Sequence, residues 1–93
     1  MPSDHAVKVV YKGADSNEFF VIANADMVTK WKSDKTVPLV DVVQSFDVFT
    51  TTNKSNTGEY ISPSKGLLES TFNTTNVDDI VKKILSEGED KGL

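Results

Sequence analysis

Residues 47–89 read DVFTTTNKSNTGEYISPSKGLLESTFNTTNVDDIVKKILSEGE, and the packing plan of the 93-residue chain is clearest there. The stretch divides into a short apolar strand at residues 48–50, a polar loop at 51–58, a returning strand at 60–61 and two helical segments. It contains no catalytic signature. The stretch therefore predicts how the chain packs and does not predict a reaction.

The last helix of this stretch has the most regular amphipathic pattern. Thr75 or Asn76 is placed to cap its first turn, and Gly88 is placed to end it. Beyond Gly88 we expect a loose tail. The apolar positions fall on one side of the helix at Ile80, Val81, Ile84 and Leu85.

A shorter helix precedes it. We expect Ser62 and Pro63 to start this helix, since serine caps helices well and proline fits the first turn. Gly66 weakens it by about 1 kcal/mol relative to alanine. Its apolar positions are Leu67, Leu68 and Phe72.

The first half of the chain opens with two strand patterns. Residues 6–11 alternate, with Val7, Val9 and Tyr11 on one face and lysine on the other. Residues 18–23 are apolar almost throughout, which is typical of a strand buried on both faces. We expect the two strands to form a hairpin, with the second at the centre of the sheet.

Two helices are expected next. The first is capped by Asn24, ends at residues 33–35 and buries Trp31 with Met27 or Val28. The second runs from Pro38 to residue 46. The order strand, strand, helix, helix then occurs twice, which predicts an α+β fold with a small, mostly antiparallel sheet packed against four helices. We expect a single domain over residues 1–93, ordered from about 6 to 88.

Composition narrows the function classes. The chain has no cysteine, so disulfides and thiolate metal sites are excluded, and it shows no apolar run near the ~18 residues of a membrane span. Net charge is −4, and all ten basic residues are lysines. Contacts to nucleic acid would therefore be point-charge contacts to phosphate with little sequence preference. We expect a soluble monomer in the cytoplasm, with the nucleus as a second compartment.

Catalytic and metal sites have no good candidates. His5 is the single histidine and has no partner in a nucleophilic pair or metal set. Asp78 and Asp79 could be paired carboxylates, but a helix N-terminus explains them better through capping and the helix dipole. We expect no enzyme, no cofactor and no metal.

A binding surface has two candidates. One is the polar loop at residues 51–58, which also contains plausible phosphorylation positions. The other is a set of lysines that would contact RNA, with an ordinary solvated surface as the alternative. Trp31 could add an aromatic platform beside them, although a core position is favoured. The lysines are Lys8, Lys12, Lys30, Lys32, Lys35, Lys54 and Lys65.

Several stretches carry a family resemblance: residues 48–50, the polar loop to Gly58, residues 67–72, and the ending DDIVKKILSEGE at 78–89. Together they resemble the FYSH domain, the N-terminal part of the Shwachman-Bodian-Diamond syndrome protein, a ribosome maturation factor. Residues 11–13, 42–50 and 64–65 are more similar still to the stand-alone fungal form, the restriction of telomere capping protein family. The resemblance extends from about residue 7 to 89.

The resemblance implies an α+β fold without enzymatic activity. It also implies a link to RNA metabolism or ribosome biogenesis, and in the fungal form to stress response and telomere capping. Two hypotheses follow. The chain is a module that contacts RNA or ribosomal particles through lysines, or it is a protein-interaction module with no direct nucleic-acid contact.

Overall fold

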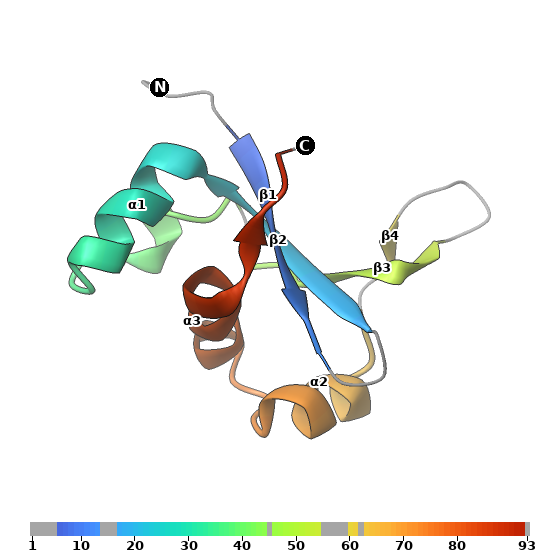
Figure 1. The fold of residues 1–93 in the computed structure, drawn as a ribbon. Coiled ribbons are helices and arrows are strands. Elements are labelled where there is room, and N and C mark those ends of the chain that lie inside the picture. The colour runs from blue at the N-terminus through green and yellow to red at the C-terminus, as the bar shows by residue number, and fades with distance from the viewer. Residues whose placement is uncertain (1–5, 14–16, 45, 55–59, 62, 93) are drawn as a thin grey trace.

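A five-stranded sheet with the order β4-β3-β2-β1-β5 forms the centre of the molecule, and each described strand pair is antiparallel. The computed structural model describes residues 6–13, 17–44, 46–54, 60–61 and 63–92. The elements along the chain are β1 (Ala6–Lys12), β2 (Glu18–Asn24), α1 (Ala25–Ser33), the 3-10 turn η2 (Leu39–Asp41), β3 (Phe49–Lys54), β4 (Tyr60–Ile61), α2 (Lys65–Phe72), α3 (Val77–Glu87) and β5 (Glu89–Asp90) (Figure 1).

The strand β2 lies at the middle of this order, as its continuous apolar run predicts. It pairs with β1 along its whole length, from Ala6 opposite Asn24 to Lys12 opposite Glu18. On its other side, Phe19 and Phe20 pair with the start of β3. The predicted hairpin and the α+β fold are confirmed.

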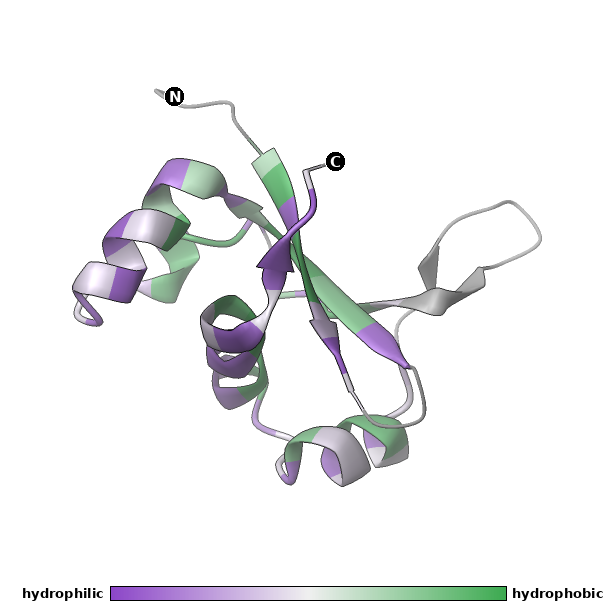
Figure 2. Cartoon of the chain, viewed as in Figure 1, coloured by the Kyte–Doolittle hydropathy of each residue, from purple (hydrophilic) through white to green (hydrophobic). Residues whose placement is uncertain are grey.

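The helices cover one face of the sheet, and the hydrophobic core lies between the helices and the sheet (Figure 1). Figure 2 shows the consequence on α3, where the surface turned toward the sheet is hydrophobic and the opposite surface is hydrophilic. Trp31 is 2% exposed, so its core position is confirmed. The predicted stripe of α3 is also fully buried, at Ile80, Val81, Ile84 and Leu85.

Side-chain caps start all three described α-helices. The carboxamide oxygens of Asn24 and Asn76 accept hydrogen bonds from the amides of Met27 and Asp79, as the sequence predicts. The helix α2 begins later than predicted, because Ser64 is its cap and accepts from the amide of Leu67 at 3.1 Å. Pro63 therefore lies before α2 and not in its first turn.

The predicted helix from Pro38 to residue 46 is wrong, and so is the twofold repeat of pattern. Within the described part of the chain, this segment contains one short 3-10 turn and then extends along β2. The amide of Asn24 donates to the Val42 carbonyl, and the amide of Gln44 donates to the Ile22 carbonyl, both at 2.9 Å. Val42 and Val43 are β-branched and fit this extended conformation, which the hydrogen bonds to β2 hold in place.

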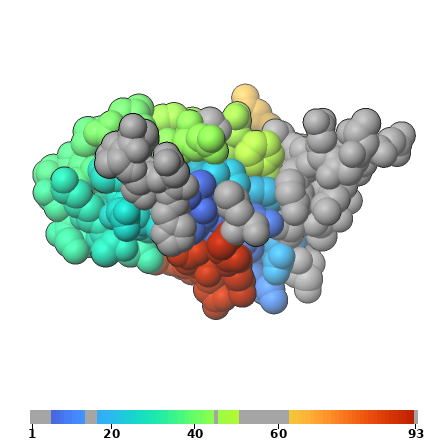
Figure 3. Space-filling model, turned by 90° about the horizontal axis from the view of Figure 1, so that it is seen from above, coloured from blue at the N-terminus to red at the C-terminus, as the bar shows by residue number. Residues whose placement is uncertain are grey.

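Two further segments are more regular than predicted. The strand β3 continues through residues 51–54, which the sequence assigns to a loop, and the rest of that loop, residues 55–58, lies outside the described residues. The expected loose tail instead begins with β5, where Glu89 and Asp90 pair with Val10 and Val9 of β1. Figure 3 shows this C-terminal segment lying directly beside β1.

Gly88 makes this return of the chain possible. It is the predicted C-cap of α3, but its φ of −79° is open to any residue, so the left-handed conformation is not the reason for glycine. A Cβ at this position would lie 2.5 Å from the Ile84 carbonyl oxygen and 2.8 Å from that of Val10. Glycine is needed because α3 and β1 come this close together.

Among the helices that the structure describes, none has the length and apolar character needed to cross a membrane.

Candidate nucleic-acid interface

The predicted lysines fall on separate parts of the fold. Lys8 and Lys12 lie on β1, whereas Lys30, Lys32 and Lys35 lie on α1 or just after it, near the opposite end of β2 from the hairpin turn. The structure therefore brings the lysines together in two groups and does not form one continuous surface from all seven. The remaining two are set apart, at the end of β3 (Lys54) and at the start of α2 (Lys65).

The β1 lysines lie on what we call the outer face, the sheet face opposite the helices. On β1, Val7 and Val9 belong to the core, so Lys8, Val10 and Lys12 point the other way. Antiparallel partners share a face, which extends the outer face across the neighbouring strands. Its described residues on the neighbouring strands are Glu18, Phe20, Ile22, Phe49 and Glu89. Lys91, which follows β5, joins them through its ion pair with Glu89.

A pair of aromatic rings lies at the centre of the outer face. Phe20 and Phe49 are stacked with ring centroids 5.4 Å apart and an interplanar angle of 30°. The Lys8 ammonium lies 5.0 Å from the centroid of the Phe20 ring, within the range of a cation–π contact. Phe20 is only 2% exposed although it is not part of the main core, while Phe49 is half-buried. A second, smaller apolar cluster therefore exists on this face.

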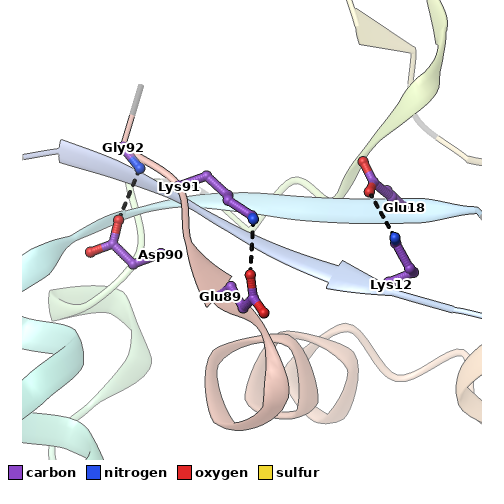
Figure 4. A network of polar contacts seen from close by, with 6 residues as sticks. All are labelled: Lys12, Glu18, Glu89, Asp90, Lys91 and Gly92. Atoms are coloured by element: carbon purple, nitrogen blue, oxygen red, sulfur yellow. Dashed lines mark hydrogen bonds and ion pairs between the residues drawn. The ribbon is translucent and has the colours of Figure 1, made fainter.

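Charged side chains lie along β1, the start of β2 and the C-terminal segment that includes β5 (Figure 4). Lys12 and Glu18 approach within 4.0 Å, and Lys91 and Glu89 within 2.9 Å. The hydrogen bond and charge of Lys91 lower the pKa of Glu89, and those of Glu89 raise the pKa of Lys91. Both ion pairs are exposed, so each contributes little to stability.

Lys91 was absent from the lysines predicted from sequence. The strand β5 that positions it consists of Glu89 and Asp90, which have low strand propensity and no apolar alternation. No pattern in the tail therefore marks it as a strand. Its placement follows from the tertiary contact at β1, where the Lys91 amide donates to the Lys8 carbonyl at 2.9 Å.

The α1 lysines surround a tryptophan that is not available for stacking. Trp31 is in the core, and the Lys35 ammonium lies 4.7 Å from the centroid of its ring. Lys30 and Lys32 are exposed in the last turn of α1, where they complement the helix dipole. This group offers positive charge without an accessible aromatic surface.

The other candidate residues take structural positions or lie outside the described residues. Asp78 and Asp79 are exposed in the first turn of α3, and the Asp79 amide is bonded to the Asn76 cap. Among the described residues, no group of histidine, cysteine, aspartate and glutamate could hold a metal ion. His5 lies outside the described residues.

The sequence is similar to a known protein family and to a protein of fission yeast. Residues 5–92 match the Shwachman-Bodian-Diamond syndrome (SBDS) N-terminal domain family. The chain is also 45% identical over 82 residues to an SDO1-like protein of Schizosaccharomyces pombe. That alignment covers 87% of this chain and 77% of the fission-yeast protein.

Proposed function

Since this chain belongs to the family of the SBDS N-terminal domain, we propose that it is a non-enzymatic binding module in ribosome maturation or related RNA metabolism. It contacts RNA or a ribonucleoprotein particle through surface lysines. The family membership supports the ribosome-related part. The observation that carries the RNA contact is the outer face of the sheet, where Lys8 and Lys12 lie beside a stacked aromatic pair.

The charges set the expected mode of contact. The net charge of −4 opposes broad non-specific binding, so the contact depends on where positive groups gather locally. Lysine ammonium groups bind phosphate as point charges and do not form the bidentate contacts that read a guanine edge. Binding is therefore expected to be moderate in affinity, tolerant of sequence and strongly weakened by salt.

Fractionation of a cell extract tests the ribosome-related role. The protein is expected to comigrate with large-subunit particles on a sucrose gradient and to leave those fractions after nuclease treatment. Titration of purified protein with total ribosomal RNA at rising salt then tests direct contact. A protein that stays at the top of the gradient and shows no RNA affinity at low salt contradicts the proposal.

A second candidate function is a protein-interaction module. Val40, on η2, is 67% exposed and Val77, at the start of α3, is 39% exposed, and both are large apolar side chains on the surface. A partner that remains bound after nuclease treatment, and is lost in a Val40→Ser variant, supports this function. Loss of each captured partner after nuclease counts against it.

A further inference from the structure

Two lysines lie side by side at the edge of the outer face. Beyond the pairing of Val10 with Glu89 and of Val9 with Asp90, the Lys91 amide donates to the Lys8 carbonyl and the Lys8 amide donates to the Gly92 carbonyl, both at 2.9 Å. The Lys91 ammonium forms an ion pair with Glu89 at 2.9 Å, and the Lys8 ammonium lies 5.0 Å from the centroid of the Phe20 ring. A phosphate bound at this edge would lie within reach of both lysine side chains.

The aromatic cluster begins on the strand next to Lys8, whose ammonium lies 5.0 Å from the centroid of the Phe20 ring. Phe20 and Phe49 share a register row with Val10 and Glu89, whereas Lys8 pairs with Ile22. Strands are spaced by about 4.8 Å, so β3 lies about 10 Å across the sheet from β1. The outer face therefore places positive charge diagonally beside the aromatic pair, over a distance that a few nucleotides span.

We propose that the outer face binds single-stranded RNA, with the ring of Phe49 stacking on a base and with Lys8 and Lys91 contacting the phosphates. This inference rests on the proposed function and assigns it to one face, including the lysine that follows β5. Single-stranded nucleic acid alternates planar bases with phosphates, and stacking rings beside a groove of positive charge recognise that alternation. An acidic peptide would match the lysines but would leave the aromatic pair without a planar partner.

The location of the charges predicts which lysines matter. The α1 group has more lysines than the outer face has on β1, but its aromatic residue is buried in the core. We therefore expect Lys30 and Lys32 to contribute only general attraction. Two double variants separate these effects, because Lys8→Gln with Lys91→Gln and Lys30→Gln with Lys32→Gln both change the net charge from −4 to −6.

The measurement is fluorescence anisotropy with a labelled ten-nucleotide oligouridine, which has little structure of its own. The Lys8→Gln/Lys91→Gln variant is expected to bind about tenfold more weakly than wild type at low salt. Loss of two phosphate contacts should also reduce the slope of log affinity against log salt by about 1.4. The α1 double variant is expected to change affinity by about twofold and to keep the slope.

Phe49→Leu tests the stacking contact separately. Leucine keeps an apolar side chain without a ring, so affinity should fall by about fivefold or more while the salt slope stays unchanged. Thermal melting of each variant establishes that it is folded before binding is compared. Amide chemical shifts of wild-type protein on titration should move along β1, β5 and the start of β3.

The possible results distinguish this inference from the proposed function on which it rests. If oligouridine binds wild type and both double variants weaken it equally, the outer-face assignment is wrong while RNA contact stands. If wild type binds neither oligouridine nor ribosomal RNA, the RNA part of the proposed function fails as well. If the outer-face variant instead loses a partner that resists nuclease, the face docks a protein and the inference is overturned.

Discussion

Replacing Gly88 by alanine tests whether the close approach of α3 to β1 holds the C-terminal strand in place. The new Cβ would lie 2.5 Å from the Ile84 carbonyl oxygen, 2.8 Å from the Val10 carbonyl oxygen and 3.0 Å from Cγ1 of Val9. Two of these atoms belong to the backbone, so they cannot turn away as a side chain can. Either the last turn of α3 or the β5 pairing must shift.

The loss of stability in Gly88→Ala follows from these contacts alone, because alanine readily adopts the φ of −79° found at Gly88. The amide of Gly88 also donates to the Ile84 carbonyl at 2.7 Å, so moving away from that oxygen weakens a hydrogen bond. Overpacking of this kind costs about 2 kcal/mol. For a domain of this size, that loss lowers the melting temperature by about 8–16 °C.

Gly66→Ala is the matched control. Gly66 lies near the start of α2, and apart from its chain neighbours and the backbone of its own helix, no atom lies within 4 Å of the Cβ that alanine would add. Alanine restricts the unfolded chain and favours the helix, so we expect a gain of about 0.4–1 kcal/mol. The same substitution therefore has opposite signs at the two positions.

Urea unfolding followed by circular dichroism measures both changes. Amide exchange at Lys8 and Lys91, whose backbone hydrogen bonds join β1 to residues 91–92, reports the release of the C-terminal segment in Gly88→Ala. A Gly88→Ala protein as stable as wild type would refute the steric argument. An equal loss in Gly66→Ala would show that glycine flexibility, and not contact, sets the effect.

Three further predictions concern the caps, the core and the tail. Asn76→Ala removes the acceptor for the Asp79 amide and should cost about 1 kcal/mol by urea unfolding, whereas Asn76→Asp should be nearly neutral; equal losses would contradict the capping role. Trp31 is buried, so its fluorescence should be blue-shifted and resistant to iodide, and a water-exposed spectrum would contradict its core position. Lys91 lowers the pKa of Glu89 in the folded protein. The ion pair therefore contributes fully to stability at pH values above the pKa that Glu89 has in the unfolded chain, and this contribution is lost as the pH falls through the pKa of Glu89 in the folded protein. Acid should therefore weaken the protection of β5 amides against exchange, and Glu89→Gln should reduce the dependence of this protection on pH. The same pH dependence in wild type and variant would contradict the role of the ion pair.

The elements that could be predicted are those whose own residues decide them. Helix α3 has a cap at Asn76 and a complete apolar stripe, and both act within the segment. The strand β2 is apolar on both faces, so a central position is the best way to bury it. The family assignment rests on the same local patterns.

The candidate interface could be predicted only in part. Alternation on β1 places Lys8 and Lys12 on one face, because side chains of a strand point to opposite sides in turn. Sequence could not show that Phe49 lies next to Phe20, since strand register joins residues far apart in the chain. For the same reason, the α1 lysines could not be separated from those of β1.

By itself the sequence determined the α+β class, the first hairpin, the capped helices α1 and α3, and the core position of Trp31. Only the tertiary structure decided the segment after Pro38 and the tail after Gly88. In both, the chain has weak local preference, so hydrogen bonds to distant strands fix its conformation: Val42 and Gln44 bond to β2, and residues 91–92 bond to Lys8. Local propensity is decisive where a segment can satisfy its own backbone, and long-range pairing is decisive where it cannot.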